Sequence, residues 1–160
     1  MVTDKDMPYL QRAIALAAEA LGAGDEPFGS VLVDASGTVL YEDRNRVNTQ
    51  EATYHPEIAV ARWAAENLAK EARQSTTVYT SGEHCAMCSA AHAWAGLGRI
   101  VYVSSSQQLG EWLEEWGVAN QSPINALPIG AIAPNIEVEG PVPELVDEIK
   151  QLQKLSNTQG

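Results

Sequence analysis

Two short segments rich in metal-ligand side chains constrain the fold of this chain more than any other feature. The first contains His55, Pro56 and Glu57, and the second contains Cys85 and Cys88. A structural zinc site has four protein ligands, whereas a catalytic site has three and leaves one position for water. Three ligand-type residues, His55, Cys85 and Cys88, are evident here. The pattern therefore predicts one zinc ion per chain with an open position, and a fold that brings both segments together.

Glu57 lies two residues after His55 and adds an acid to this set. Zinc lowers the pKa of bound water towards neutrality, and a nearby carboxylate can take the proton. The residues thus favour a hydrolytic zinc enzyme with Glu57 as the catalytic acid–base. One alternative is a closed structural zinc site with His84 or Glu57 as fourth ligand. A redox Cys-x-x-Cys is another, but it would not need His55 and Glu57.

Length and composition indicate one globular domain over residues 1–160, with 45% hydrophobic residues. No apolar run approaches the ~18 residues of a membrane span. Residues 1–6 contain no basic region and no apolar core follows them, which argues against a signal peptide. Both cysteines of the chain belong to the one Cys-x-x-Cys. We therefore expect a cytoplasmic protein without a membrane segment.

The charge balance bears on the kind of partner. The chain has 10 Lys and Arg against 21 Asp and Glu, a formal net charge of −11. Affinity for nucleic acid rests mainly on basic residues that neutralise phosphates. The balance argues against a polynucleotide substrate and favours a small molecule.

Apolar spacing and turn residues predict alternating helices and strands. Expected helices cover residues 6–21, 56–70, 85–96 and 143–155. A further short helix is expected to be capped by the serines at 104–106 and to run through residues 112–116. Expected strands cover 28–34, 38–41, 76–80, 99–103 and 137–139, and residues 44–54 and 117–135 are expected as loops. This order predicts an α/β fold, a three-layer α/β/α arrangement with a mixed, roughly five-stranded sheet.

Both metal-ligand segments fall at predicted helix starts. A residue before proline is driven out of the helical region, so His55 should be extended at or just before the N-cap, with Pro56 as the first helical residue. Cys85 and Cys88 should share the first turn of the next helix. Helix N-termini favour thiolates, the form that zinc requires.

The order His-x-Glu followed by Cys-x-x-Cys resembles the zinc-dependent cytidine deaminase-like superfamily of nucleobase and nucleoside deaminases. Residues 27–33 are similar to the first strand of its guanine, cytosine and tRNA-adenosine deaminase branch. Residues 78–81 are closer to guanine deaminases than to tRNA deaminases. The resemblance extends well from about residue 6 to 103 and is weak beyond.

The resemblance implies a role for each matching residue. His55, Cys85 and Cys88 would hold Zn²⁺, and Glu57 would shuttle protons. Asn45 would orient the base, and Phe28 would form an apolar wall near the ring. It also implies a homodimer formed through the helices after the zinc ligands, with which the alanine-rich residues 89–95 agree.

Three departures from the family pattern affect substrate choice. His84 stands where the family usually has Pro, and it could donate to substrate or simply pack. Pro56 replaces a frequent Ala and has no N–H for a substrate oxygen. The acidic and aromatic C-terminal region of guanine deaminases is not matched. Residues 111–116 could supply an aromatic lid, or form an amphipathic helix with Trp112 and Trp116 packed inwards.

We therefore expect a hydrolase of C–N bonds in cyclic amidines that acts on a small nucleobase, guanine or a related aminopurine. Alternatives are cytosine, a nucleoside or another aminated heterocycle, a tRNA adenosine, and a non-catalytic zinc module. His92 is expected to be buried or at an interface rather than a ligand, as are Trp63 and Trp94. Four acids are expected as solvated loop charges: Asp25, Glu26, Glu42 and Asp43.

Overall fold

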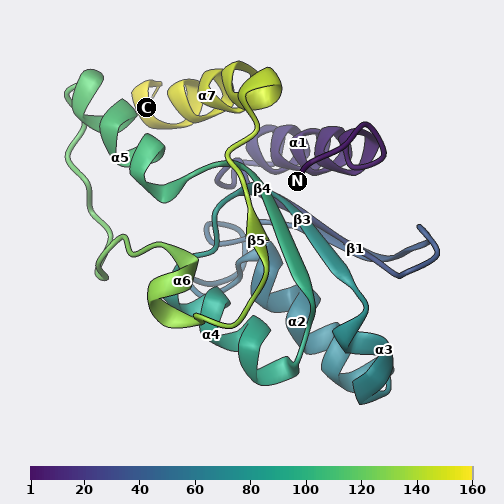
Figure 1. Ribbon diagram of the computed structural model, residues 1–160. Helices are drawn as coiled ribbons and strands as arrows, with labels where there is room; N and C mark the ends of the chain where they lie inside the picture. The colour runs from purple at the N-terminus through teal and green to yellow at the C-terminus, as the bar shows by residue number, and fades with distance from the viewer. Residues whose placement is uncertain (160) are drawn as a thin grey trace.

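A computed structural model describes residues 1–159, and in this part of the chain five strands form one mixed sheet (Figure 1). The strand order is β2-β1-β3-β4-β5. β1 pairs antiparallel with β2 and β3, whereas β3, β4 and β5 run parallel. The strands are β1 (Gly29–Val33), β2 (Val39–Arg44), β3 (Thr77–Gly82), β4 (Arg99–Ser104) and β5 (Val138–Glu139).

Helices cover both faces of the sheet (Figure 1). One face carries α1 (Met7–Gly22), α5 (Ser106–Glu115) and α7 (Pro143–Thr158). The other carries α2 (Pro56–Asn67) and α4 (Ala86–Ala95), with the short α3 (Lys70–Gln74) and α6 (Ile129–Ile132) beside them. The predicted three-layer α/β/α arrangement is confirmed. Within residues 1–159, no helix combines the length and the apolar character that crossing a bilayer requires.

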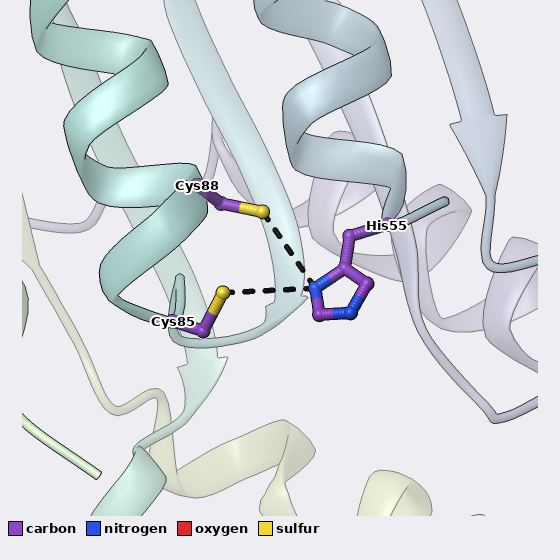
Figure 2. A group of neighbouring side chains, drawn as sticks. All are labelled: His55, Cys85 and Cys88. Atoms are coloured by element: carbon purple, nitrogen blue, oxygen red, sulfur yellow. Dashed lines mark hydrogen bonds between the residues drawn. The ribbon is translucent and has the colours of Figure 1, made fainter. Parts of the chain in front are cut away.

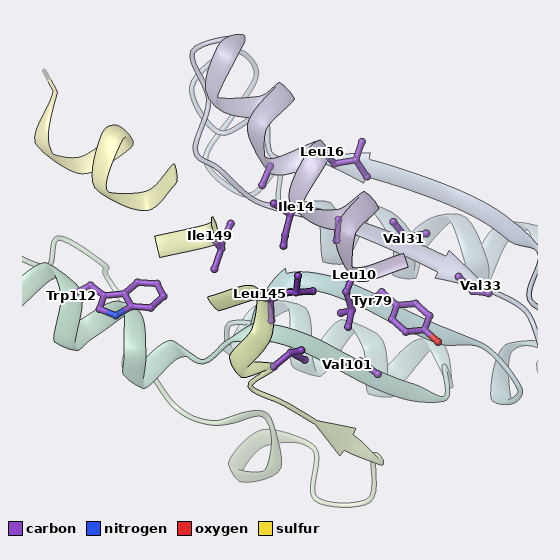
Figure 3. Packing of buried hydrophobic residues seen from close by; sticks show 14 residues of the cluster. Leu10, Ile14, Leu16, Val31, Val33, Tyr79, Val101, Trp112, Leu145 and Ile149 are labelled. Carbon is purple, nitrogen blue, oxygen red and sulfur yellow. The ribbon is translucent and has the colours of Figure 1, made fainter. Parts of the chain in front are cut away.

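The central strands are apolar on both sides because helices cover both sides. Successive side chains of a strand point to opposite faces, which sorts the core into two clusters. The cluster under α1 and α7 contains Val31, Val33, Tyr79, Val101 and Val103 (Figure 3). The cluster under α2 and α4 contains Leu32 and Val78, together with Val60, Ala61 and Ala64 of α2.

Several elements differ from the predictions, and three of the differences have a visible cause. The expected helix 56–70 ends at Asn67, because Leu68 is extended with φ −117° and ψ 143°, and α3 starts afresh at Lys70. β2 continues to Arg44, since it pairs with β1 as far as Gly29. The expected loop 117–135 contains α6, which begins after an extended Pro128. These boundaries depend on tertiary packing rather than on local sequence.

The short helix after β4 forms as predicted, and its cap explains where it starts. Ser105 is the N-cap of α5, and its hydroxyl accepts a hydrogen bond from the backbone N–H of Gln108. The side chain of Gln108 in turn accepts from the backbone N–H of Ser105, which completes a capping box. The cap fixes the direction in which α5 leaves the sheet.

Close packing of α1 on β1 generates a stability prediction at Gly29. A Cβ at this position would overlap the backbone oxygen of Ala13 and lie 2.9 Å from the backbone nitrogen of Ala17. We expect Gly29→Ala to lower the free energy of unfolding by ~1–3 kcal/mol, because the helix must move away from the strand. Urea denaturation measures the change. Gly22→Ala is the matched control, since nothing lies within 4 Å of its added Cβ. Equal stability of both variants would contradict the described packing.

Candidate active site

The candidate metal ligands lie at the start of two helices, as predicted (Figure 2). His55 is the N-cap of α2, extended with φ −87° and ψ 144°, and Pro56 is the first helical residue. Cys85 is the N-cap of α4, with φ −70° and ψ 175°, and Cys88 follows in the first turn. α4 starts just after β3, at the carboxyl end of a parallel strand, where α/β sheets commonly bind ligands.

The three donor atoms are close enough to share one metal ion. Nδ1 of His55 lies 3.6 Å from Sγ of Cys85 and 3.7 Å from Sγ of Cys88. Ligand atoms on a tetrahedral zinc are about 3.5–4 Å apart, and nitrogen with thiolate sulfur is a donor set that zinc prefers. Among the described residues, neither His84 nor Glu57 belongs to this group. The geometry fits the three-ligand prediction rather than the closed four-ligand alternative.

The two thiols titrate as a coupled pair. A hydrogen bond from Cys88 lowers the pKa of Cys85 to about 4, and His55 strengthens the effect against the opposing effect of burial. The same sulfur–sulfur contact raises the pKa of Cys88 well above that of an ordinary thiol. One thiolate therefore exists readily in the metal-free protein. A divalent cation that binds both sulfurs displaces the second proton.

Glu57 lies in the first turn of α2 and is buried, with 5% of its surface exposed. Burial raises the pKa of its carboxyl group to about 7, although the nearby His55 lowers it. The hydroxyl of Thr80 donates to its Oε1 at 3.2 Å. A carboxyl group that titrates near neutral pH can both accept and donate a proton, which suits acid–base chemistry.

The support behind Glu57 was missed in the sequence. Ser30 on β1 donates to Oγ1 of Thr80 on β3 at 2.9 Å, so two neighbouring strands hold the hydroxyl that contacts Glu57. Both residues are fully buried. Threonine is common in strands, so the sequence carried no signal that separated this pair from ordinary sheet residues.

A cavity of about 200 Å³ opens beside the metal ligands. Its wall brings together five residues predicted for the site: Phe28, Asn45, His55, Glu57 and Cys85. The opposite wall comes from α5 and from the segment 120–127, which the sequence analysis did not connect with the site. On α5, Leu109 and Leu113 line this wall.

Asn45 is buried and rigidly oriented at the cavity. Its backbone N–H donates to the carbonyl of Phe28 at 3.0 Å, and its Oδ1 accepts from the backbone N–H of Val47 at 3.0 Å. The side-chain oxygen is thus occupied within its own loop. The amide nitrogen is the group of Asn45 that can donate to a ligand in the cavity.

The loop that carries Asn45 depends on Asp25, so the expectation that Asp25 is solvated was wrong. Asp25 is 2% exposed and accepts from the backbone N–H groups of Asn48 and Thr49, both at 2.9 Å, and from Arg44 at 3.0 Å. Burial raises its pKa, but these hydrogen bonds and that of the Thr49 hydroxyl outweigh burial and lower the pKa to about 2. Asp43 is likewise buried and forms an ion pair with Arg46. The expectation that Asp43 is a solvated loop charge was therefore also wrong.

His84 does not lie in the cavity, which corrects the expected substrate contact. It is fully buried, and its ring meets that of His92 edge-on at 5.6 Å. Burial lowers the pKa of both histidines. His84 therefore packs in the interior, which was the alternative to a substrate contact. The expectation that His92 is buried and is not a ligand is confirmed.

Glu83, the neighbour of His84, does line the cavity. Its two carboxylate oxygens accept the backbone N–H groups of Ser106 at 3.0 Å and of Ile129 at 2.9 Å. Glu83 thereby ties the turn before Cys85 to the starts of α5 and α6. Glu83, rather than the predicted His84, therefore borders the cavity.

Trp112 and Trp116 pack inwards, as one of the two interpretations predicted. Trp112 is 7% exposed within the cluster under α7, and Trp116 packs against that cluster. Neither lines the cavity. The proposed aromatic lid is therefore wrong, and the leucines of the same helix face the cavity instead.

Comparison with known proteins identifies the family of this chain. Residues 3–104, more than half of the chain, match the model of the cytidine and deoxycytidylate deaminase zinc-binding region. A probable cytosine deaminase of Schizosaccharomyces pombe is 35% identical over 143 residues, which cover 88% of this chain and 86% of that protein. Guanine deaminase of Bacillus subtilis is 34% identical over 105 residues, covering 64% and 67%.

A solved structure supports the fold. The guanine deaminase structure from Nitrosomonas europaea superposes with a TM-score of 0.69 over 98% of this chain and 86% of that chain, and at 21% identity it speaks for the fold alone. The family match includes the three donor residues that lie together at the start of α2 and α4. The chain belongs to the zinc-binding cytidine and deoxycytidylate deaminase family, whose members are hydrolytic deaminases.

Proposed function

We propose that this protein is a hydrolytic deaminase of a small free nucleobase, with guanine or a related aminopurine favoured. The observation that carries the proposal is the cavity in which the buried carboxyl of Glu57 lies beside the donor atoms of His55, Cys85 and Cys88. A nucleophile, a proton carrier and a site for a ring meet there. Deamination needs these three components.

His55, Cys85 and Cys88 would hold a zinc ion, which would supply an activated water for attack on the amino-bearing carbon. Glu57, beside this position, would accept a proton from the water and return protons to the ring nitrogen and to the departing ammonia. Its pKa of about 7 lets it act in both directions at neutral pH. The Thr80 hydroxyl can donate to one oxygen of this carboxyl group.

Two further residues orient the base. The amide nitrogen of Asn45 donates to a ring carbonyl oxygen, which guanine and cytosine both have. The ring of Phe28 forms an apolar wall and packs against Gly82, where a Cβ would lie 3.1 Å from the aromatic carbons. Glycine at this position leaves room for the aromatic ring.

The charges of the cavity bear on the substrate. Three carboxylates, those of Glu26, Glu57 and Glu83, lie in the described wall, and no Lys or Arg does. Such a cavity repels phosphate and accepts hydrogen bonds from N–H groups, in which guanine is rich. It therefore favours a free base over a nucleotide, and the net charge of −11 argues against tRNA.

Cytosine is the second candidate, and a specific observation supports it. The probable cytosine deaminase of Schizosaccharomyces pombe matches 88% of this chain, whereas the guanine deaminase of Bacillus subtilis matches 64%. The longer match includes part of the chain after β4, which contributes the second wall of the cavity. Turnover of a panel of bases decides between the candidates.

We also propose a homodimer in the cytoplasm. Trp94 on α4 is 91% exposed, and small residues such as Ala90 and Ala91 lie on the same helix. An exposed Trp is unfavourable in water and is enriched at interfaces, while small side chains let two helices approach closely. Reduced thiols as metal ligands agree with a reducing compartment.

The first prediction from the proposed function concerns catalysis by Glu57. With zinc loaded, the protein should release ammonia from at least one of guanine, 2,6-diaminopurine, cytosine, adenine and their nucleosides. Glu57→Gln should keep its fold and about one zinc per chain but lose turnover by ~10²–10⁴-fold, because the proton carrier is removed. Ammonia release, zinc content and circular dichroism are measured together.

Glu66→Gln is the matched control for this variant, since Glu66 is an exposed acid on the same helix. It should retain the turnover of the parent protein. If the zinc-loaded parent releases no ammonia from any member of the panel, the proposed function is wrong.

A second prediction follows from the raised pKa of Glu57. In metal-free protein the folded state has a pKa of about 7 against 4.5 for an ordinary Glu, so it binds the extra proton between these values. Stability should fall as pH rises from 4.5 through 7, by roughly 3 kcal/mol relative to Glu57→Gln. Urea unfolding of both proteins at several pH values measures the difference. A difference that does not change with pH would contradict the described burial.

A third prediction tests the proposed dimer. Trp94→Glu should convert a dimer to a monomer in sedimentation experiments, because a charge replaces the apolar centre of the contact. Leu155→Glu, at a 44% exposed position of α7, is the control and should leave the dimer intact. A monomeric parent protein, or a dimeric Trp94→Glu variant, would refute the proposal.

A further inference from the structure

Glu26 enters the cavity from a rigid stretch of backbone between α1 and β1. Its carbonyl accepts the backbone N–H of Phe28 at 2.9 Å. On one side, Asp25 is buried and anchored by the hydrogen bonds described above. On the other, Pro27 is buried and its carbonyl accepts from Gln153 of α7 at 3.3 Å. Glu26 is exposed, as expected of a solvated loop charge, and it also lines the cavity.

The three carboxylates of the cavity differ in how they are used. Oε1 of Glu57 accepts from Thr80, and Glu83 accepts two backbone N–H groups, one per oxygen. Within residues 1–159, no hydrogen bond or ion pair involves the carboxylate of Glu26, and only burial and the charges of His55 and Asp25 act on it. Burial raises its pKa, which indicates partial loss of solvent. Glu26 is thus an exposed carboxylate that borders the cavity and has no hydrogen-bond donor from the described part of the protein.

Burial also orders the acids from the inside of the cavity to its rim. Glu57 is 5% exposed beside the metal ligands, whereas Glu26 belongs to the exposed class of residues. A base whose amino-bearing carbon faces Glu57 therefore turns its opposite edge towards the rim. In cytosine that edge carries the N1–H group, and in guanine it carries the imidazole N–H. These are the nitrogens that bear ribose in nucleosides.

We propose that Glu26 is a specificity-determining residue that accepts the ring N–H on the edge opposite the reacting amino group. A carboxylate there forms a charge-assisted hydrogen bond with a free base. When this nitrogen carries a substituent, it has no hydrogen to donate to the carboxylate, and the substituent has too little room. Glu26 thereby selects free bases over nucleosides and other N-substituted bases. This inference rests on the proposed deaminase function and adds the recognition of one substrate edge.

Matched pairs of bases test the proposal. The pairs are cytosine with 1-methylcytosine and guanine with 9-methylguanine, which differ only in the N–H that Glu26 would accept. For whichever base the protein deaminates, we expect the parent to prefer the unsubstituted member in kcat/KM. Glu26→Ala should reduce this preference by roughly 10- to 100-fold, mainly by slowing the unsubstituted base. The preference of Glu26→Gln should lie between those of the parent and of Glu26→Ala, because its amide oxygen still accepts a hydrogen bond but carries no charge.

A binding measurement separates recognition from chemistry. In the zinc-loaded Glu57→Gln background, calorimetry compares the Kd of each unsubstituted base with and without Glu26→Ala. The added substitution should weaken binding of the unsubstituted base and leave the methylated base nearly unchanged. Glu114→Gln, an exposed acid on α5, removes the same charge outside the cavity and should change neither ratio.

The possible outcomes distinguish this inference from the function on which it rests. If the parent deaminates a base and Glu26→Ala leaves both the kcat/KM ratio and the Kd ratio unchanged, the role of Glu26 is refuted while the deaminase stands. If Glu114→Gln lowers the ratios as much as Glu26→Gln does, the effect is general electrostatics and the role of Glu26 is refuted. If the zinc-loaded parent turns over no base, both proposals fail.

Discussion

The close approach of one imidazole nitrogen to two sulfurs holds the functional part of this fold together. His55 and Cys85 come from the starts of α2 and α4, which pack side by side on one face of the sheet. Each residue is extended where its helix begins, so the ligand atoms point past the helix end rather than along it. The same feature places Glu57 in the first turn of α2, beside the candidate metal ligands. Backbone geometry, rather than long flexible side chains, therefore positions the ligands and the acid together.

Burial of Glu57 creates the property that deamination needs and also an energetic problem. A carboxylate without solvent is unfavourable, and its raised pKa expresses that penalty. One hydroxyl donor from Thr80 stabilises the ionised form partially but does not restore a normal pKa. Several strong donors would do so, as they do for Asp25, whose pKa falls to about 2. Two buried acids in one molecule thus differ because Asp25 accepts several strong hydrogen bonds, whereas burial dominates at Glu57.

Local rules explain why much of the site could be predicted from the sequence. Proline forces the preceding His55 into an extended conformation, and Cys-x-x-Cys brings two sulfurs to one side of a helical turn. The resemblance to the deaminases added Asn45 and Phe28, which no local rule singles out. His84 and Asp25 were misjudged because their surroundings depend on contacts between segments distant in the chain. α6 was missed for the same reason, since Ile129 is held by packing and by Glu83 rather than by helix signals.

The origin of substrate choice follows from how the cavity is divided. The family match ends at residue 104, and it contains the metal ligands, Glu57 and Asn45. The opposite wall, from Ser106 to Leu127, lies outside that match. Glu83 connects the two parts through the starts of α5 and α6. Under the proposed function, the second wall is the part of the cavity that can differ between relatives acting on different bases. The cytosine and guanine deaminases are 35% and 34% identical to this chain, and the proposed contact of Glu26 lies on the matched side of the cavity.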